Sequence, residues 1–474
     1  MNHFDIIIIG AGSGGLNIAG FMRRLGFKIL LVDKSDANIG GDCLNFGCVP
    51  SKALIHVART IASSRKSKEY GLSVGGAVEI EKVIAHINRS KEIIRTHEHA
   101  DWFRSLGIDV VLGEAKMVGP REIQVADGHY SAKRIVIATG SRPRELDIPG
   151  IQEALTYTNE TIFSITELPK RFVFIGGGPI SVELGQAFAQ LGSSVTIVSR
   201  EDHILPREDS TMSAVLASHM EKDGVLFQFG ASPVRVEGGA VLVVKDNAGT
   251  ETKIPFDALF IGIGRVLNVE GLDLEKAGVA VEKGKIVVDR FLSTTNSNIF
   301  TVGDVAGGHQ FTHAAELHAA TLLRNMFLPR LFWKPLNSDH LSWVTYTSPE
   351  IATFGLGEEE LKKRNTTYRV LDESFHEDDR AITDEYRDGA VKLFVATNGK
   401  LLGGTMVAPN AGELIQELIL MNTLGIPAAK LSGKIYPYPS AARINKKVLS
   451  ALSIERLRGL NLTLLRFLWK MFNR

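Results

Sequence analysis

Two copies of one strand–glycine–helix–strand unit constrain the fold of this chain more than any other feature. Each copy has an apolar run, a glycine-rich turn, a helical stretch and a second apolar run. In the first copy these four segments are 4–9, 10–15, 16–24 and 28–32, in that order. In the second copy they are 172–175, 176–181, 182–191 and 195–198. The steps from Gly10 to Asp33 and from Gly176 to Ser199 are both 23 residues. Continuous apolar runs are typical of parallel strands buried on both faces. The sequence therefore predicts an α/β fold with two Rossmann-like dinucleotide-binding units.

The glycines of each turn suit a dinucleotide pyrophosphate. They permit a tight turn and let the backbone approach the phosphates at a helix N-terminus. We expect these cofactor-binding glycines to be Gly10, Gly12 and Gly15 in the first unit and Gly176 and Gly178 in the second. Asp33, at the end of the first unit, is suited to hold the hydroxyls of a ribose.

The second unit ends in Ser199-Arg200, where the first has an acid. An arginine at this place can pair with a ribose 2′-phosphate. We therefore expect NADPH rather than NADH there, bound by Ser199 and Arg200. The alternative is that Arg200 is solvated beside Glu201 and Asp202, and Arg207 is a weaker second candidate for the phosphate.

The chain has two cysteines, Cys43 and Cys48, with four residues between them. They can form a disulfide if the start of a helix is distorted, because the Cα atoms must come within roughly 4.4–6.8 Å. The neighbouring glycines, Pro50 and Lys52 indicate a tight entry into a helix with a cation nearby, which lowers a thiol pKa. This favours a redox-active pair over the alternative of two thiols packed as small apolar groups.

Length, charge and hydropathy narrow the class of protein. A chain of 474 residues exceeds the size of a single hydrophobic core, so several domains are expected. The 54 Lys and Arg residues balance the 53 Asp and Glu residues, which argues against a nucleic-acid partner. The buried run 4–9 leaves no room for a signal peptide, and no apolar run reaches the roughly 18 residues of a membrane span. We therefore expect a cytoplasmic protein with catalytic rather than structural cysteines.

The segment Gly40–Lys52, with its Gly-Gly-Asp-Cys-Leu-Asn-Phe-Gly-Cys-Val-Pro-Ser-Lys sequence, resembles the active-site segment of the flavin-dependent pyridine nucleotide-disulfide oxidoreductases. The resemblance extends from the N-terminus to about residue 455 and implies that the first unit binds FAD. It implies that Cys43 exchanges with substrate and that Cys48 is a thiolate against the flavin. Asp42 stands where many relatives have Thr or another small polar residue.

The resemblance implies further site residues. Lys52 would lie near the flavin ring and pair with Glu183. The runs 135–138 and 300–302 lead into turns that resemble later FAD-contacting segments, so further cofactor contacts are expected from Thr139, Gly140 and Asp304. Gly264 is a further candidate for cofactor binding. We expect no resident metal ion.

The resemblance also implies a division into domains. We expect an FAD-binding domain over 1–150 and 271–337, an inserted NAD(P)H-binding domain over 151–270, a dimerisation domain over 338–455 and a tail over 456–474. Strands over 344–346, 368–375, 390–396 and 402–407 with a helix over 413–425 predict that the third domain is α+β. In the family this domain forms the homodimer and completes the partner's active site. The alternative is a substrate or regulatory module without dimerisation.

One departure from the family lies near the C-terminus. Disulfide reductases of this group have a His-Pro motif followed by Glu that protonates the departing thiolate, and Tyr438 and Arg443 stand at these places here. A tyrosine of pKa ~10 donates a proton but is a poor base near neutrality. Mercuric reductases also have tyrosine here and share the segments 344–346 and 375–380, although this chain lacks their C-terminal vicinal cysteines and metal-carrier domain. Tyr438 is therefore expected to act at the active site on a metal ion.

The tail has helically spaced apolar residues with basic residues and Trp469 around them and no acids. This pattern is typical of an interfacial helix, which would give peripheral membrane contact. The alternative is a helix docked on the dimer.

Together these features predict an FAD-dependent, NADPH-oxidising homodimer whose Cys43–Cys48 disulfide reduces a small acceptor, such as a thiophilic metal ion. Three alternatives are a dihydrolipoamide dehydrogenase or other disulfide reductase, a quinone reductase at a membrane surface, and a redox sensor.

Overall fold

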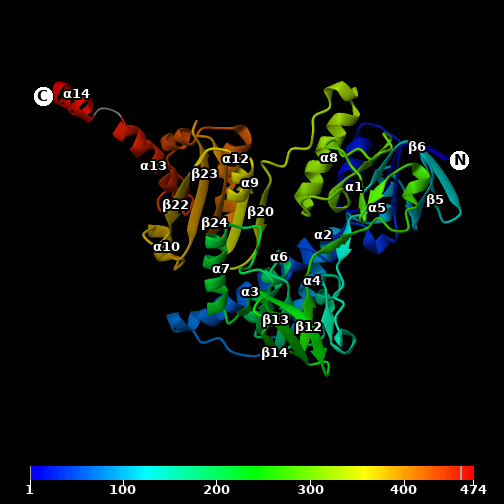
Figure 1. The fold of residues 1–474 in the computed structure, drawn as a ribbon, viewed down its shortest axis with the longest axis horizontal. Helices are drawn as coiled ribbons and strands as arrows, with labels where there is room; N and C mark the ends of the chain where they lie inside the picture. Colours follow the sequence, from blue (N-terminus) through cyan, green and yellow to red (C-terminus); the bar gives the residue numbers. More distant parts are fainter. Residues whose placement is uncertain (1, 460–461, 474) are drawn as a thin grey trace.

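The computed structural model describes residues 2–459 and 462–473. Its three largest sheets lie apart from one another. In Figure 1 the sheet that holds the N-terminal strand lies on the right, the C-terminal sheet lies on the left, and the sheet of the second glycine unit lies below and between them. The site described below lies where these three parts face one another.

The first sheet has the order β3-β2-β1-β6-β5-β4, with β19 paired to β6. Its strands are β1 (Asn2–Ile9), β2 (Ile29–Asp33), β3 (Asp109–Leu112), β4 (Ala115–Gly119), β5 (Glu122–Val125), β6 (Gly128–Ile137) and β19 (Ile299–Thr301). The β4–β5 and β5–β6 pairs are antiparallel and the others are parallel. Because β19 pairs with β6, the chain leaves this sheet after β6 and returns after the second unit.

Strand β1 is buried on both faces, as its apolar sequence predicts. Ile6 and Ile8 pack towards α1 (Ser13–Arg24) and α8 (Thr312–Met326), whereas Ile7 and Ile9 pack towards β4 and β5. This alternation follows from the two-residue repeat of a strand.

The second sheet is parallel, in the order β11-β10-β9-β15-β8. Its strands are β8 (Thr156–Tyr157), β9 (Arg171–Ile175), β10 (Ser194–Val198), β11 (Leu226–Gln228) and β15 (Ala258–Ile261). One hydrophobic cluster joins this sheet to two helices, α6 (Pro179–Leu191) and α7 (Ser210–Lys222). A second hydrophobic cluster joins the sheet to three antiparallel strands, β12 (Ala231–Glu237), β13 (Val241–Asp246) and β14 (Glu251–Pro255). Two short antiparallel pairs join β7 (Ser141–Pro143) to β16 (Arg265–Leu267) and β17 (Val281–Glu282) to β18 (Lys285–Ile286).

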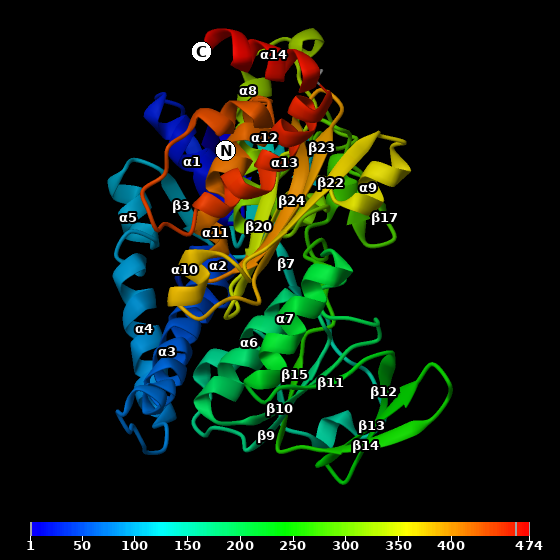
Figure 2. The same ribbon diagram turned by 90° about the vertical axis from the view of Figure 1, so that its left-hand side faces the viewer.

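Four helices lie between β2 and β3 in the chain: α2 (Gly41–Asn45), α3 (Cys48–Lys66), α4 (Ile80–Arg95) and α5 (Ala100–Ser105). Leu54, Ile55 and Ala58 of α3 belong to the hydrophobic cluster that also includes buried residues of α4 and α6. Figure 2 shows α3 and α4 running side by side. Helix α3 therefore fixes its first residue, Cys48, relative to the second unit.

The third sheet is antiparallel, in the order β20-β21-β24-β23-β22. Its strands are β20 (Ser342–Thr345), β21 (Glu350–Gly355), β22 (Tyr368–Ser374), β23 (Ala390–Ala396) and β24 (Leu401–Ala408). The helices of this part are α9 (Glu358–Lys363), α10 (Asp379–Thr383), α11 (Ala411–Leu414), α12 (Gln416–Leu424), α13 (Arg443–Gly459) and α14 (Leu462–Phe472). The prediction that the third domain is α+β is confirmed.

Three details differ from the sequence predictions. Strand β21 was not predicted, because its buried residues show no alternation that distinguishes a strand from a loop in the core. The helix expected over 413–425 is interrupted at Ile415, which ends α11 and precedes α12. The tail contains α14 and the end of α13 rather than one helix, and its residues 460 and 461 lie outside the described residues. Within the described ranges, no helix is long and apolar enough to cross a membrane.

Candidate active site

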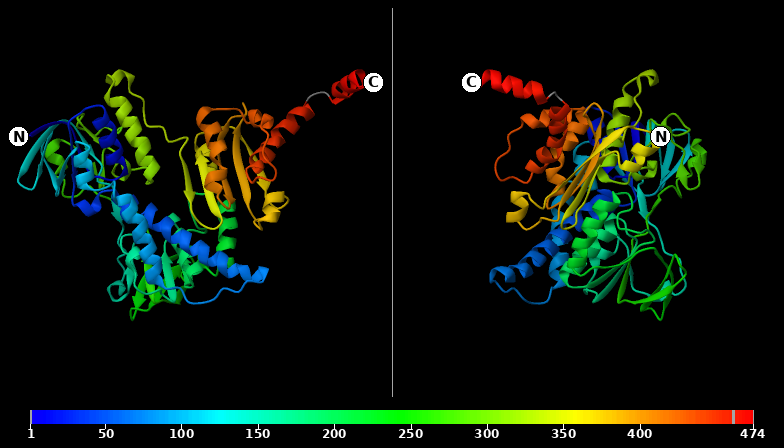
Figure 3. Two further views of the ribbon diagram at one scale, coloured as in Figure 1. Left: turned by 180° about the vertical axis from the view of Figure 1, so that it is seen from behind. Right: turned by 60° about the vertical axis from the view of Figure 1, so that its left-hand side comes forward.

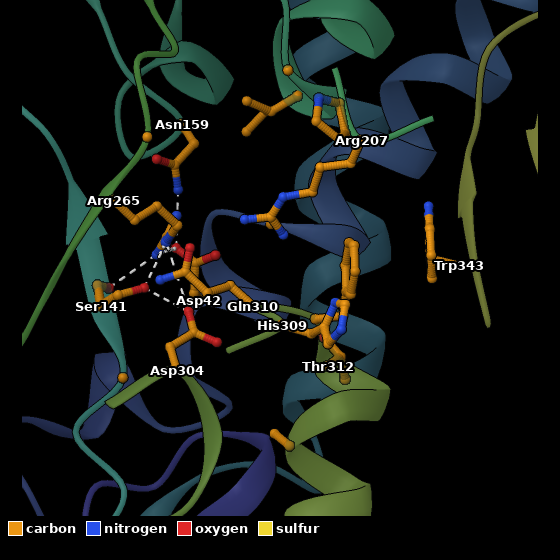
Figure 4. Close-up of a pocket in the computed structure, with 18 of the residues that line it drawn as sticks. Asp42, Ser141, Asn159, Arg207, Arg265, Asp304, His309, Gln310, Thr312 and Trp343 are labelled. Atoms are coloured by element: carbon orange, nitrogen blue, oxygen red, sulfur yellow. Dashed lines mark hydrogen bonds and ion pairs between the residues drawn. The ribbon is translucent and has the colours of Figure 1, made fainter. Parts of the chain in front are cut away.

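A cavity of about 2370 Å³ reaches both glycine turns and both cysteines. Ligand cavities are usually about 300–1,000 Å³, so this one has room for more than one ligand. Figure 4 shows a part of it that Asp304, Arg207, His309 and Trp343 line. Most of the predicted site residues also line it, namely Cys43, Cys48, Lys52, Glu183, Gly10, Gly12, Asp33, Thr139, Gly140, Asp304, Gly176, Gly178, Ser199, Arg200 and Gly264. Gly15 and Tyr438 do not.

The cysteines lie at a sharp entry into α3. Cys43 lies in α2, and Cys48 begins α3 after Gly47. Gly41 has a φ of +62°, and a Cβ there would lie 2.7 Å from Gly12 Cα. Glycine at these positions therefore lets the cysteine segment press against the first dinucleotide turn. Both cysteines are free thiols in this structure.

The two thiols have opposite pKa shifts. A hydrogen bond from Cys43, above all, lowers the pKa of Cys48 to about 6, although burial opposes this. The Lys52 ammonium and the Thr312 hydroxyl, 3.6 Å from Cys48 Sγ, lower it further. The same hydrogen bond and burial raise the pKa of Cys43. At neutral pH this arrangement gives a Cys48 thiolate beside a neutral Cys43 thiol.

An ion pair joins α3 to α6 beside the thiolate. Lys52 Nζ lies 2.8 Å from Glu183 Oε2, and the other oxygen of Glu183 accepts the backbone N–H of Tyr346 at 2.8 Å. Lys52 also lies over the Tyr346 ring, 4.6 Å from its centroid. Burial acts to lower the pKa of Lys52, but Glu183 and Cys48 outweigh it and raise the pKa overall. Lys52 therefore stays protonated next to Cys48.

A second network joins the cysteine turn to the other parts of the cavity wall. Ser141 Oγ donates to Asp304 at 2.5 Å, and Arg265 Nε donates to Ser141 Oγ at 2.6 Å. Arg265 also lies 3.2 Å from Asp42, which accepts an amide hydrogen bond from Asn159 at 2.9 Å. Figure 4 shows these side chains converging. Burial is the main cause that raises the pKa of Asp304.

Sequence reasoning missed four residues of this site: Ser141, Asn159, Arg265 and Thr312. Arg265 had a usable signal, because it follows Gly264 near the carboxyl end of the buried strand β15, where ligands of open α/β sheets bind. Ser141 begins the short strand β7, Asn159 lies in a turn and Thr312 begins α8, and none of the three has a signal in the sequence.

The first glycine turn fits a dinucleotide such as FAD. Gly10 has a φ of +109°, and a Cβ there would lie 2.3 Å from the carbonyl oxygen of Ala138. Helix α1 has no side-chain cap after Gly12, so its first amides are available to phosphate oxygens. Asp33 accepts the Ala11 N–H at 2.7 Å and has a pKa raised mainly by burial.

Three further predicted residues lie at or near this turn. Gly15 does not line the cavity, and a Cβ there would lie 2.1 Å from the Gly10 carbonyl oxygen, so glycine at this position lets α1 pack closely against the turn. Thr139 and Gly140 follow β6, with the Thr139 hydroxyl donating to the Asn268 carbonyl at 2.6 Å.

The second glycine turn, at Gly176 and Gly178, resembles the first one in its backbone conformation. Gly176 has a φ of +110°, and a Cβ there would lie 2.3 Å from the Gly262 carbonyl oxygen, whereas a Cβ on Gly178 would meet open space. Helix α6 also lacks a side-chain cap and begins with proline at its first turn, where no N–H is needed. Ser199 is buried and accepts the Glu201 N–H at 3.2 Å.

Arg200 is solvated beside Glu201, as in the alternative that the sequence left open. Its side chain is 82% exposed and its Nε lies 2.8 Å from Glu201. Arg207 extends into the cavity (Figure 4). Both arginines therefore line the cavity near the end of the second unit.

Tyr438 lies apart from the cysteines of its own chain. It is 69% exposed, its hydroxyl donates to Asp379 at 3.1 Å, and the Arg443 guanidinium lies 4.9 Å from its ring centroid. The hydrogen bond to Asp379 is the main cause that raises its pKa. A contact with the cysteines would therefore need a second subunit.

Two dinucleotide-binding units around a dithiol, followed by an antiparallel third part, define a nucleotide-linked dithiol oxidoreductase. The family model described as pyridine nucleotide-disulphide oxidoreductase matches residues 4–319, and the model of that family's dimerisation domain matches 341–448. The chain belongs to this family of FAD-dependent flavoproteins, has a redox disulfide centre and carries the family's dimerisation domain.

The relatives differ in their substrates. The chain is 32% identical to a dihydrolipoyl dehydrogenase of Thermus scotoductus, over 97% of this chain and 100% of that protein. It is 29% identical to a mercuric reductase of Staphylococcus aureus, over 96% and 83%. A solved structure of RclA from Escherichia coli, an HOCl-induced flavoprotein disulfide reductase in complex with Cu(II), matches with a TM-score of 0.82 and 27% identity, over 95% of this chain and 100% of that one.

Proposed function

We propose that this protein is a homodimeric flavoprotein that oxidises NADPH and reduces a thiophilic metal ion at Cys43 and Cys48. The observation that carries the choice of acceptor is Tyr438, which stands in place of a histidine and donates to Asp379. Because this hydrogen bond raises its pKa, Tyr438 is a weaker acid than an ordinary tyrosine and no base near neutrality. A disulfide substrate needs its leaving thiolate protonated, but a metal ion does not.

Residues of this chain would hold the cofactors on two sides of the thiols. The turn at Gly10 and Gly12 with Asp33 and Asp304 would bind FAD, and the turn at Gly176 with Arg200 or Arg207 would bind NADPH. When bound, FAD would accept a hydride from the nicotinamide and supply two electrons to the disulfide. Lys52, held by Glu183, keeps a positive charge beside Cys48 and so favours its thiolate.

The dithiol has the chemistry that a soft metal ion needs. Cys48 is already a thiolate at neutral pH, and Cys43 loses its proton when it coordinates the metal. Closing the Cys43–Cys48 disulfide releases two electrons, which reduce one Hg(II) to Hg(0) or two Cu(II) to Cu(I). The similarity to a mercuric reductase and to a flavoprotein solved with Cu(II) supports this choice.

An acceptor panel tests the proposal. NADPH oxidation by the purified holoenzyme is measured with Hg(II), Cu(II), glutathione disulfide, lipoamide and a soluble quinone, for the wild type and for Cys43→Ser. We expect the metal ions to stimulate turnover most, and Cys43→Ser to lose this stimulation while keeping its FAD.

Three results would overturn the proposal, each in favour of another function. Fast reduction of lipoamide or glutathione disulfide would indicate a disulfide reductase. Quinone reduction that survives in Cys43→Ser would indicate flavin-to-quinone transfer. A wild type that turns over none of these acceptors would indicate a redox sensor.

A further inference from the structure

Helix α14 presents large apolar side chains to solvent. Figures 1 and 3 show it beyond α13, extending away from the three sheets. Most of its large apolar side chains are exposed, with Trp469 at 69% and Phe472 at 75%, and the exposed set is Leu464, Leu465, Phe467, Trp469, Met471 and Phe472. A concentration of large apolar groups on one short helix is unusual for a surface that only meets water.

The polar residues of α14 and the residue after it form one narrow stripe. Thr463, Arg466, Lys470 and Asn473 follow one another at intervals of three, four and three residues, which puts them on one side of a helix. Apolar residues occupy the rest of the circumference. The apolar arc is therefore wider than the seam that one partner helix would cover.

The charge of this region has one sign. From residue 456 to the end, the sequence has five basic residues, Arg456, Arg458, Arg466, Lys470 and Arg474, and no acidic residue. The chain as a whole has a net charge of only +1, so this local excess is not a general property of the protein. Basic residues beside a broad apolar arc complement a surface that has anionic groups above a hydrocarbon layer.

We propose that α14 binds the surface of an anionic lipid bilayer. Its 11 residues span about 16 Å at the helical rise, roughly half of a bilayer core of about 30 Å, so the helix lies in the plane of the membrane and does not cross it. The apolar arc enters the acyl boundary, while Arg466 and Lys470 lie at the level of the lipid phosphates. Trp469 lies at the interface, where indole rings are favoured.

Vesicle co-sedimentation of the full-length holoenzyme tests this proposal. The vesicles contain equal parts of phosphatidylglycerol and phosphatidylcholine, and vesicles of phosphatidylcholine alone serve as the neutral comparison. One variant, Arg466→Gln/Lys470→Gln, removes the charges, and a second, Leu468→Glu/Phe472→Glu, disrupts the apolar arc. The matched control, Lys66→Gln/Lys68→Gln, removes the same charge from two exposed lysines at the end of α3 and in the turn after it.

We expect the wild type and the Lys66/Lys68 control to bind the anionic vesicles equally. A basic residue near an anionic surface contributes about a fivefold gain in partitioning, so Arg466→Gln/Lys470→Gln should bind about thirtyfold more weakly. The Leu468/Phe472 variant should lose binding. FAD content and NADPH turnover in solution should be unchanged in all variants, which shows that each one is folded.

Three results would overturn the proposal. The first is equal binding by the wild type and the two α14 variants, and the second is no binding by the wild type. The third is dissociation of the dimer, seen by light scattering, when residues 462–474 are deleted, since α14 would then be a docking element between subunits. Quenching of tryptophan fluorescence by brominated lipids gives an independent readout, and Trp469→Phe should reduce it.

Discussion

Lys52 Nζ lies 2.8 Å from Glu183 Oε2, and this contact joins the helix that begins with Cys48 to the helix that follows the second glycine turn. Glu183 is 6% exposed and Lys52 is partly exposed to the cavity. A charge next to the thiolate is thus held in place by the part of the protein that would bind the nicotinamide nucleotide. The charge state of Cys48 consequently depends on how these two helices pack.

Replacing Lys52 with Met should raise the pKa of Cys48 above about 6. The ammonium stabilises the thiolate, and removal of a close opposite charge shifts a pKa by roughly 1–3 units. The measurement is the rate of iodoacetamide alkylation of Cys48 against pH in the reduced protein, followed by mass spectrometry. Lys52→Arg keeps the charge and should keep the midpoint near that of the wild type. An unchanged midpoint in Lys52→Met would exclude Lys52 as the residue that sets the charge state.

The stability of the reduced protein should rise between pH 6 and the ordinary thiol pKa of about 8.5. The pKa of Cys48 is lower in the folded than in the unfolded chain, so its stabilisation is complete above the unfolded value and is lost as the pH falls through about 6. Cys43 has a raised pKa and opposes this only above the unfolded value. Thermal unfolding midpoints of wild type and Cys48→Ser check this.

The oxidised protein is the matched control for that experiment, because it has the same histidines and carboxylates but no thiol that titrates. The unfolding midpoint of the reduced form should rise with pH relative to that of the oxidised form over this range, and Cys48→Ser, which cannot form the disulfide, should lack this rise. A difference that is independent of pH would contradict the lowered pKa of Cys48.

Replacing Glu201 with Gln should increase the preference for NADPH over NADH. The Glu201 carboxylate lies 2.8 Å from Arg200 and competes with a ribose 2′-phosphate for the guanidinium. Exposed ion pairs contribute roughly 0–1 kcal/mol, so the gain in the ratio of kcat/KM values should be up to about fivefold. Arg200→Glu should lower the same ratio by about 10–100-fold. If Arg207→Gln causes that loss and Arg200→Glu does not, Arg207 binds the phosphate instead.

Alanine substitutions at the two glycine turns should have different effects. A Cβ on Gly10 would lie 2.3 Å from the Ala138 carbonyl oxygen, so Gly10→Ala should displace the turn and lose FAD, measured by the flavin absorbance of the purified protein. Gly178 has a φ of −79° and open space around its Cβ position. Gly178→Ala should fold and keep FAD but raise KM for NADPH. Full FAD content in Gly10→Ala would show that this close approach is not required.

Tyr438 should be needed for reduction of a metal ion and not for retention of FAD. Tyr438→Phe removes the hydroxyl that donates to Asp379 and should lower the metal-stimulated rate. The double change Tyr438→His/Arg443→Glu restores an acid–base pair and should raise lipoamide reduction by up to about 100-fold, the lower range of such catalysis. The control is Tyr436→Phe, which changes a nearby tyrosine whose hydroxyl donates to Glu417. Equal effects of Tyr436→Phe and Tyr438→Phe would argue against a specific role.

The two glycine units could be predicted closely because their signals are local. The run 4–9 became β1 (Asn2–Ile9), and the run 172–175 became β9 (Arg171–Ile175). Gly10 and Gly176 have positive φ values, and a side chain at either place would collide with the backbone of a neighbouring turn. Such constraints act through residue type and spacing, which a sequence shows directly.

Contacts in the site between residues that are far apart in the sequence could not be predicted in the same way. The Arg265–Asp42 ion pair joins residues from different parts of the chain, and Thr312 reaches Cys48 from the start of α8. Thr312 is an ordinary helix-start residue, and the place of Arg265 after Gly264 indicates a ligand site but not Asp42 as its partner. Only the packing of the sheets and of α3 brings them together.

The sequence by itself determined the fold class, the two dinucleotide turns and the redox pair, because strand burial, glycine backbone freedom and cysteine spacing are properties of short segments. The resemblance already implied that Cys48 is the thiolate, and the tertiary structure supplied the physical cause of its lowered pKa. The hydrogen bond from Cys43 is the largest cause, and Lys52 follows Cys48 by one helical turn of α3, whereas burial and Thr312, from the start of α8, act on Cys48 only through the folded arrangement. The tertiary structure also decided that Arg200 pairs with Glu201 and that α14 extends away from the sheets, since both depend on which neighbours the fold supplies.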